Sequence, residues 1–369
     1  MDARVIRHPR VTEIENLPAL IARHGDLAGT VVQSVTIPAG RVDWAAARLD
    51  GLVLLGCTFE DSAEEQVARQ RGALVFPPLP SKPYSPYRTG LYTPAELLAD
   101  RGDGLSVDEG IYRHFEGSGR HQADLIEALA QRIHDHAIDD ALGDLLDRWE
   151  NPPMVGIMGG HSTLRTEPAY ADAARTAWLL GQAGYTVATG GGPGTMEAAN
   201  LGAWLASVAD PAVLDEALAV LAPAPHYSSA GHQDAAERVR SRFPVGVESV
   251  AIPTWFYGHE PSNLFASHAA KYFANSIRED RLLAVADAGV VFTPGSAGTA
   301  QEVFQNAAQN HYETLGRTAP MVFVGRDHWE ERTRIVPAIR AQAEGRPYAE
   351  LITCVDDPAD AVAFIAEGA

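Results

Sequence analysis

Short apolar runs alternate with longer amphipathic segments through the second half of the chain. Each run has the length and character of a buried strand. The runs are MVGIMG (154–159), YTVATG (185–190), SVAIPT (249–254), GVVFTP (289–294), MVFVG (321–325) and LITCV (351–355). Helix-like spacing fills the segments between them. This alternation, with almost continuously apolar strands, predicts a parallel sheet covered by helices on both faces, the Rossmann-like doubly wound α/β class.

The first part of the chain carries shorter strand-like runs and one helix-like run. The strand-like runs are SVTIPAG (34–40), GLVLLGCTF (51–59) and GALVFPP (72–78). The helix-like run, DSAEEQVARQ (61–70), lies between the last two. This order predicts a smaller N-terminal α/β domain. We find no internal repeat and no low-complexity tail in the pattern.

A proline- and tyrosine-rich segment, 77–94, follows these runs and cannot form a regular helix. We interpret it as an extended arm on the surface, with a substrate lid as the alternative. A helical pattern over 122–149 then ends at ENPPM. The break at 151–153 predicts an N-terminal domain over residues 1–150 and a ligand-binding domain over residues 151–369.

Composition narrows the class of protein. The 369 residues are 46% hydrophobic and 21% charged, as in soluble globular chains long enough for two domains. The net charge of −19 opposes broad contact with a nucleic-acid polymer or an anionic membrane. Cys57 and Cys354 are the only cysteines, which favours a reducing compartment. Since the N-terminus has no apolar signal core and no run approaches the roughly 20 residues of a spanning helix, we expect a cytoplasmic protein.

Two glycine-rich turns follow strands of the predicted sheet, TGGGPGTME (189–197) and TPGSAGTAQE (293–302). A glycine turn that opens a helix offers backbone N–H groups and a positive dipole to an anion. Neither turn is a dinucleotide fingerprint or a Walker A loop, so a small phosphorylated ligand is favoured over NAD or ATP. Plain tight turns are the alternative. The candidate phosphate-binding residues are Gly159, Gly160, Gly191, Gly192, Gly194, Thr195, Gly295, Ser296, Ala297, Gly298 and Thr299.

Glu302 stands in the first turns of the helix that the second glycine turn opens. A glutamate there is often only a partner of the helix dipole. Beside a phosphate loop, however, a carboxylate faces repulsion, which favours a functional role. Upstream, Arg278 and Arg281 precede the strand, and an arginine is needed to neutralise a phosphate.

The segments GGGPGTMEAANLGA and PGSAGTAQE, with Arg278 nine residues before Asp287, resemble the LOG (lonely guy) family. The family motif is Pro-Gly-Gly-x-Gly-Thr-x-x-Glu, preceded by Arg-Lys. The resemblance covers roughly residues 153–369 and is greater to the longer bacterial nucleotide nucleosidases than to the short plant enzymes. Two positions depart from the motif, because Ser296 replaces a glycine and Glu279 replaces the lysine.

This resemblance implies a Rossmann-like fold, a homodimer or higher homo-oligomer, and hydrolysis of the N-glycosidic bond of nucleoside 5'-monophosphates to free base and ribose 5-phosphate. By position, Glu302 matches the catalytic glutamate and Arg278 the catalytic arginine. Three residues match the phosphate loop, namely Gly295, Gly298 and Thr299. Ser296 fits the turn if its backbone angles suit a non-glycine residue. With Glu279 in place of the lysine, the base or ribose contacts that the resemblance implies at this position are left open.

Other chemistries have less support in the sequence. Pyridoxal-dependent decarboxylation needs a Schiff-base lysine, and the two lysines, Lys82 and Lys271, stand in no pyridoxal context. His134 and His136 are two apart on a predicted helix and so point in different directions, which disfavours a metal site. We therefore expect neither a metal nor another cofactor.

The sequence thus predicts an N-glycosidase in which Glu302 stabilises the cationic ribose and orients water. Arg278 is expected to hold the phosphate or the base edge. Candidate ribose or base contacts are Glu197, His259, Glu260 and Asn263. The alternative is a module of the same fold that binds a nucleotide or a pterin cofactor without cleaving it, which Ser296 and Glu279 favour.

Overall fold

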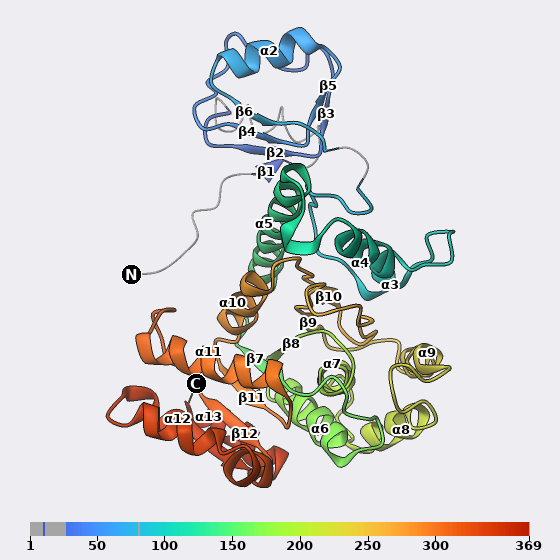
Figure 1. The fold of residues 1–369 in the computed structure, drawn as a ribbon, viewed down its shortest axis with the longest axis vertical. Helices are drawn as coiled ribbons and strands as arrows, with labels where there is room; N and C mark the ends of the chain where they lie inside the picture. The colour runs from blue at the N-terminus through green and yellow to red at the C-terminus, as the bar shows by residue number, and fades with distance from the viewer. Residues whose placement is uncertain (1–9, 12–26, 80–81, 369) are drawn as a thin grey trace. The chain divides into compact units, whose positions relative to one another are not determined.

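The computed structural model describes residues 10–11, 27–79 and 82–368, which form two compact units (Figure 1). The N-terminal unit consists of Asp2–Gly90 and Ala123–Ala141, and the doubly wound unit of Leu91–Gln122 and Leu142–Ala369. This division differs from the single boundary at 151–153, because 91–122 belong to the doubly wound unit. Most of the N-terminal stretch considered for a signal core, and residues 80–81 of the proline-rich segment, lie outside the described residues.

A seven-stranded sheet, parallel throughout, forms the centre of the doubly wound unit. Its strands in spatial order are β10 (His268–Ala269), β9 (Val250–Ala251), β8 (Thr186–Thr189), β7 (Met154–Met158), β11 (Gly289–Phe292), β12 (Met321–Val324) and β13 (Ile352–Val355). All six predicted strands are present, and the predicted doubly wound class is confirmed. Only β10 was missed, because two residues give no measurable periodicity.

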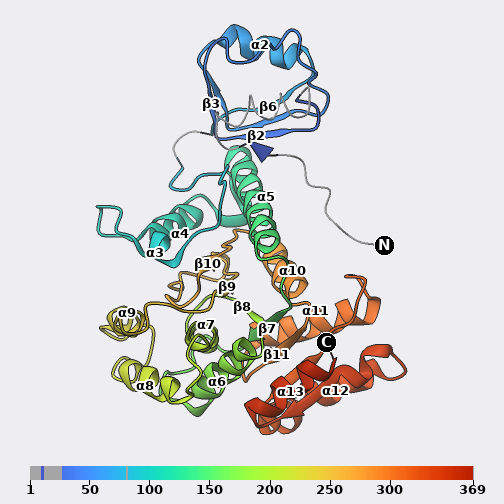
Figure 2. The same ribbon diagram turned by 180° about the vertical axis from the view of Figure 1, so that it is seen from behind.

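Two groups of helices cover this sheet, as the opposite views in Figures 1 and 2 show. One group is α6 (Pro168–Gln182), α7 (Thr195–Leu205) and α13 (Pro358–Gly368). The other is α10 (Asn275–Val285), α11 (Ala297–Tyr312) and α12 (Ile335–Ala343). From β7 the chain proceeds through β8 to β10, then returns to β11 on the other side of β7. The strand order thus reverses between β7 and β11. Because crossovers are right-handed, connections that run in opposite directions along the sheet place their helices on opposite faces.

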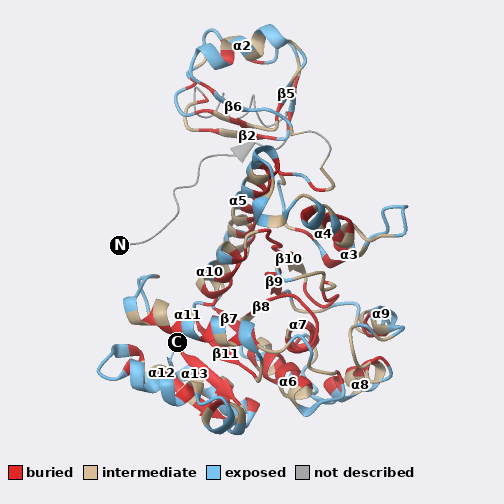
Figure 3. Ribbon diagram, in the orientation of Figure 1, coloured by how far each residue is buried: buried red, intermediate tan, exposed pale blue. Residues whose placement is uncertain are grey.

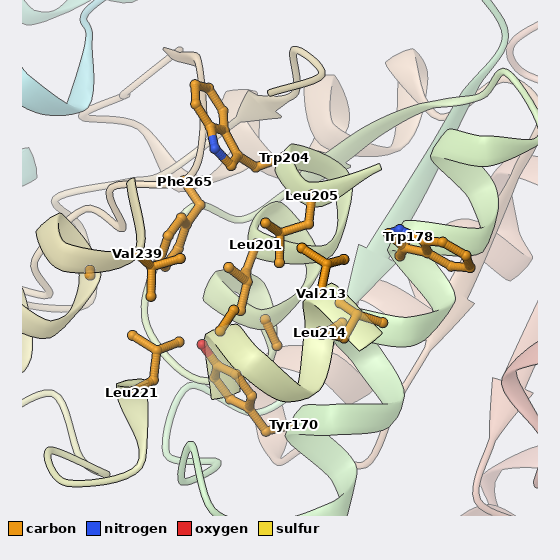
Figure 4. Packing of buried hydrophobic residues seen from close by; sticks show 14 of the residues in the cluster. Tyr170, Trp178, Leu201, Trp204, Leu205, Val213, Leu214, Leu221, Val239 and Phe265 are labelled. Carbon is orange, nitrogen blue, oxygen red and sulfur yellow. The ribbon is translucent and has the colours of Figure 1, made fainter. Parts of the chain in front are cut away.

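Burial follows this layering, with the strands and the inner sides of the helices buried (Figure 3). A large apolar cluster joins α6 and α7 to α8 (Ala212–Leu221) and α9 (His232–Arg242). Figure 4 shows Tyr170 and Leu201 in this cluster, and Trp204 at one end of it. Gly202 lets α6 and α7 approach closely, because a Cβ there would lie 1.9 Å from the Ala174 carbonyl oxygen.

The segment before the sheet contributes helices α3 (Pro94–Leu98) and α4 (Val107–Gly117) and the short η1 turn (Arg120–Gln122). Ser106 caps α4 by accepting a hydrogen bond from the Glu109 N–H at 3.1 Å. The long helix α5 (Leu125–Arg148) follows and confirms the helix predicted over 122–149. Within the described residues, no helix has both the length and the apolar character needed to span a membrane.

The N-terminal unit is a stack of parallel strands with a repeat that the sequence analysis did not detect. Its main sheet has the order β1 (Arg10–Val11), β2 (Val31–Gln33), β4 (Val53–Leu55) and β6 (Leu74–Phe76). Beside it, β3 (Thr36–Ile37) pairs with β5 (Thr58–Phe59), and α2 (Ser62–Gln70) confirms the predicted helix. Val31 pairs with Val53, 22 residues later, and Thr36 pairs with Thr58, also 22 residues later.

The repeated positions carry apolar side chains at the same spacing. Leu27, Val32, Val35 and Ile37 recur 22 residues later as Leu49, Leu54, Cys57 and Phe59. Seven of these eight side chains are buried and Phe59 packs against them, so each turn of chain covers its neighbour. The expectation of no internal repeat was therefore wrong. The similarity lies in spacing rather than in residue identity, which made it easy to overlook.

The proline-rich segment is irregular where it is described, as predicted, but its aromatic side chains are not on the surface. Tyr84, Tyr87 and Tyr92 are buried. Tyr84 donates a hydrogen bond to Glu127 in the N-terminal unit, and Tyr92 forms an antiparallel bridge with Ala269 in the doubly wound unit. The described part of the segment is thus anchored by its tyrosines rather than laid across the surface.

Candidate functional site

A cavity of about 610 Å³ opens beside the carboxyl ends of β7, β8, β9 and β11. It adjoins the point where the strand order reverses, the usual ligand position in open α/β sheets. Residues from both glycine-rich turns line the same cavity. The lining residues are Gly159, Gly160, His161, Gly190, Gly192, Met196, Pro253, Thr254, Tyr257, Gly258, Glu260, Lys271, Arg278, Glu279, Ser296, Ala297, Gly298, Thr299, Gln301 and Glu302.

The turn before α11 presents a helix N-terminus to this cavity. Ser296 is the N-cap residue, yet its side chain makes no capping hydrogen bond. Since the first N–H groups of a helix have no partner within it, those of Ala297, Gly298 and Thr299 are available to an anion. Gly295 lies just behind this lining, because a Cβ there would stand 2.1 Å from the Thr299 Oγ1.

Ser296 is compatible with the turn although the related motif has glycine at this position. Its φ of −111° and ψ of −146° lie outside the left-handed region that favours glycine. The condition set for this substitution in the sequence analysis is therefore met. The departure at Ser296 does not argue against an anion-binding turn.

The turn before α7 contributes to the cavity through Gly190, Gly192 and Met196. The other candidates of this turn are absent from the lining, namely Gly191, Gly194 and Thr195. Their backbone groups hold the turns together: the Thr195 N–H donates to the Gly160 carbonyl at 3.0 Å. The Thr195 N–H of this second turn therefore holds the end of β7 in place and is not available to a ligand.

Gly159 and Gly160, two of the candidate phosphate-binding residues, follow β7 and line the cavity. A Cβ on Gly159 would stand 2.1 Å from the Thr293 Oγ1, so no larger residue fits there. The Gly160 N–H donates to the Pro294 carbonyl at 3.2 Å. This bond ties the end of β7 to the glycine turn after β11.

Arg278 and Glu302 come together in the cavity, although 24 residues separate them. The Arg278 Nη1 donates to the Glu302 Oε1 at 3.3 Å and to the Glu279 Oε1 at 2.6 Å. Its Nε donates to the Ile252 carbonyl at 2.7 Å, which fixes the guanidinium beside the end of β9. Gly190 leaves room for it, because a Cβ there would lie 2.3 Å from Nη2.

Glu302 has the electrostatic character of a group that can hold or release a proton near neutral pH. Burial raises its pKa from 4.5 to about 7, and the charge of Glu279 adds to this rise. The neighbouring Arg278 opposes the shift by favouring the carboxylate. A perturbed carboxyl in a cavity is a candidate catalytic group.

Of the four candidate ribose or base contacts, only Glu260 lines the cavity. Its Oε1 lies 3.8 Å from the His161 Nδ1. Asn263 instead supports the glycine turn, since its Nδ2 donates to the Gly192 carbonyl at 3.2 Å. His259 lies outside the lining, with its Nε2 3.8 Å from the Asp108 carboxylate.

Glu197 points away from the cavity into a buried ion-pair network. It accepts two hydrogen bonds from Arg165, at 2.5 and 2.9 Å, and one from the Tyr170 hydroxyl at 2.8 Å. His232 and Arg165 hold the pKa of Glu197 at about 2 against the opposing effect of burial. The structure therefore gives Glu197 a role within the protein rather than at the ligand.

Several lining residues were not among the sequence candidates, and Lys271, Glu279 and Tyr257 are the most informative. Lys271 is 2% exposed and its Nζ lies 2.8 Å from both oxygens of Asp108. Asp108 comes from α4, which no local pattern connects with the sheet. Tyr257 belongs to the segment YGHEPSN (257–263), from which the sequence analysis selected His259, Glu260 and Asn263. Among the described residues, no cluster of histidine, cysteine and acidic side chains is arranged to hold a metal ion.

Comparison with known proteins gives structural neighbours but no relative by sequence. No family model matches the chain, and no curated protein matches it. One similar solved structure is the molybdenum cofactor binding protein from the phototrophic bacterium Rippkaea orientalis, with 13% identity and a TM-score of 0.36. Another is the Moco carrier protein from Chlamydomonas reinhardtii, with 16% identity and a TM-score of 0.36. Each match covers 58% of this chain and 96% of the other chain. The fold class assigned above rests on the strand order and helix layers of this chain itself.

Proposed function

We propose that the cavity binds a nucleoside 5'-monophosphate and that the protein hydrolyses its N-glycosidic bond. The observation that carries the proposal is the joint placement of the open α11 N-terminus and the Arg278–Glu302 pair on one cavity wall. The first is suited to a phosphate and the second to a carbon centre that becomes positive. A cavity of about 610 Å³ is within the usual range for a small-molecule site.

The phosphate is held by the backbone N–H groups of Ala297, Gly298 and Thr299, with the Thr299 hydroxyl as a further donor. The dipole of the 16-residue helix α11 favours a negative charge at this end. Lys271 is the only lysine among the described lining residues, and its ammonium group is paired with the Asp108 carboxylate. The site therefore relies on backbone donors, which suits one phosphate better than three.

In this proposal Glu302 acts on the ribose. As the base departs, positive charge develops on the sugar ring, and a carboxylate near the anomeric carbon stabilises it and orients a water molecule. Water then supplies a hydroxyl to the anomeric carbon and a proton to the departing base, giving ribose 5-phosphate and free base. Arg278 keeps the carboxylate in position and balances its charge.

The decisive experiment compares one base as nucleoside, 5'-monophosphate and 5'-triphosphate under identical conditions, with free base and ribose 5-phosphate measured. Charge-assisted hydrogen bonds contribute about 1.5 to 3 kcal/mol each, so removing the phosphate should lower catalytic efficiency at least roughly a thousandfold. The triphosphate should also be a poor substrate. Equal cleavage of nucleoside and monophosphate would contradict the phosphate role of the α11 turn.

A second candidate is a module that binds a nucleotide or a related cofactor without cleaving it. The observation in its favour is the engagement of Arg278, whose guanidinium is shared between Glu279, Glu302 and the Ile252 carbonyl. Ligand-induced thermal stabilisation with no product across the common monophosphates would support it. The ligands for that assay include the molybdenum cofactor, which the two structural neighbours are described as binding or carrying.

A homodimer formed through the doubly wound unit remains our expectation from the LOG resemblance. Light scattering at micromolar concentration tests it directly. A monomer at that concentration would reject the expectation without affecting the proposed chemistry.

A further inference from the structure

Glu279 has a carboxylate oxygen for which the protein supplies no partner. The side chain is 1% exposed and lines the cavity. Its Oε1 accepts a hydrogen bond of 2.6 Å from Arg278, whereas its buried Oε2 has no hydrogen-bond partner among the described residues. Buried acceptors are rarely left unpaired, because they lose water without gaining a donor.

The charged and polar groups around Glu279 have partners of their own. The Tyr257 hydroxyl accepts from the Asn275 Nδ2 at 2.8 Å and donates to the Gln301 Oε1 at 3.1 Å. Lys271, the other cation in the lining, is held by Asp108. The groups described around the cavity thus leave Oε2 of Glu279 without a donor.

The sign of its charge restricts which part of the ligand Glu279 can contact. A phosphate is repelled by this carboxylate and is drawn to the α11 N-terminus instead. What remains is the uncharged part of a nucleotide, its base and sugar. The apolar surfaces of Met196 and Pro253 and the partly exposed ring of Tyr257 also line the cavity, and such surfaces suit a flat heterocycle.

We propose that Glu279 is a specificity-determining residue that accepts a hydrogen bond from a neutral donor on the base or sugar of the ligand. This inference rests on the proposed binding of a nucleotide in the cavity. An exocyclic amine of the base and a ribose hydroxyl share this donor chemistry. A ligand that lacks the donor leaves Oε2 unpaired and binds more weakly.

The test measures dissociation constants by isothermal titration calorimetry on the full chain, with each ligand checked for integrity afterwards. Guanosine and inosine monophosphates differ by the 2-amine, and adenosine and purine riboside monophosphates by the 6-amine. Ribonucleotides and their 2'-deoxy and 3'-deoxy forms report on the hydroxyls. We expect at least a tenfold loss of affinity in one of these pairs, and that pair identifies amine or hydroxyl as the donor.

Glu279→Gln then assigns the preference to this residue. Because the glutamine oxygen must accept from Arg278, its Nε2 replaces the free acceptor with a donor, and the preference should fall below threefold. Asp280→Asn is the matched control, since the neighbouring Asp280 is exposed, lies outside the cavity lining and should leave the ratio unchanged. Wild-type protein that binds the members of every pair within threefold overturns the inference, and so does a preference that survives Glu279→Gln.

The test of Glu279 can be distinguished from the test of the proposed hydrolysis. Discrimination without any release of base keeps the role of Glu279 and rejects the hydrolysis. Release of base without discrimination keeps the hydrolysis and rejects the role of Glu279. The comparison between wild-type ligand pairs needs no variant, so the inference is testable even where Glu279→Gln fails to fold.

Discussion

The two units of the chain use parallel strands in different ways. In the N-terminal unit, strands of two or three residues pair with strands 21 or 22 residues away, and the same apolar positions are filled in successive turns of chain. In the doubly wound unit, strands of two to five residues pair across connections of very different length, and the order reverses between β7 and β11.

This difference explains why the candidate site lies in the doubly wound unit. In a repeat, each turn of chain packs against the next turn, so residues of similar, apolar type lie together. A reversal of strand order leaves a crevice at the carboxyl ends, where loops from distant parts of the chain converge. Arg278, Glu279 and Glu302 meet in that crevice, so the doubly wound unit carries the candidate site.

The largest expected effect comes from Glu302→Gln, which preserves size and removes the charge. If this carboxylate stabilises the cationic ribose, turnover should fall roughly 100- to 10,000-fold with little change in stability. Steady-state assays of base release, with denaturation curves alongside, measure both quantities. Glu331→Gln, an exposed change in the same unit, serves as the control. Near-normal turnover in Glu302→Gln would show that this carboxylate in the crevice is not the catalytic group.

The buried Arg165–Glu197 pair tests the stability of the doubly wound unit. Arg165→Met leaves Glu197 as a buried charge without its main partner, which should cost about 3 to 5 kcal/mol of unfolding free energy. Denaturant unfolding followed by tryptophan fluorescence measures the loss. The exposed Arg175→Met on α6 should change stability by less than about 0.5 kcal/mol. Equal effects of the two changes would mean that the network contributes nothing specific.

Leu54→Ala tests whether the N-terminal unit is separate from the chemistry. Leu54 is fully buried in the repeat, so the change should cost that unit about 2 to 5 kcal/mol. Leu74→Ala, at a leucine that is 57% exposed, should cost less than about 1 kcal/mol. Base release at temperatures where the unit stays folded should be unchanged in both variants. A large drop in turnover for Leu54→Ala alone would show that the repeat supports the site.

The smallest effect is a pH dependence that originates at Glu302. Burial raises its pKa to about 7, so the stability that its protonated form contributes is present at low pH and is lost as pH rises through about 7. The carboxylate is the proposed active form, so catalytic efficiency should rise about tenfold between pH 6 and a plateau above pH 8. The pH profile should be flat over this range in Glu302→Gln. Activity that decreases from pH 6 to 8 would assign the active form to the protonated acid instead.

Much of the larger fold follows from local sequence patterns. The apolar runs at 154–159, 289–294 and 321–325 became buried strands because each is short, continuous and bounded by turn residues. The glycine turn at Gly295 and the acid at Glu302 were identified for the same reason, since a turn and its following helix lie within one short segment. The sequence alone thus determined the sheet class and the segment that forms one wall of the cavity.

The tertiary structure decided which residues share that site. Asp108 and Lys271 are 163 residues apart, and Arg278 contacts Glu302 across 24 residues, so no local period relates them. Glu197 and Glu302 both follow glycine turns, yet Glu197 is paired with Arg165 inside the protein and Glu302 lines the cavity. Sequence spacing fixes the direction of a side chain only within its own helix or strand. Its neighbours, and through them its charge and its role, depend on how those elements pack.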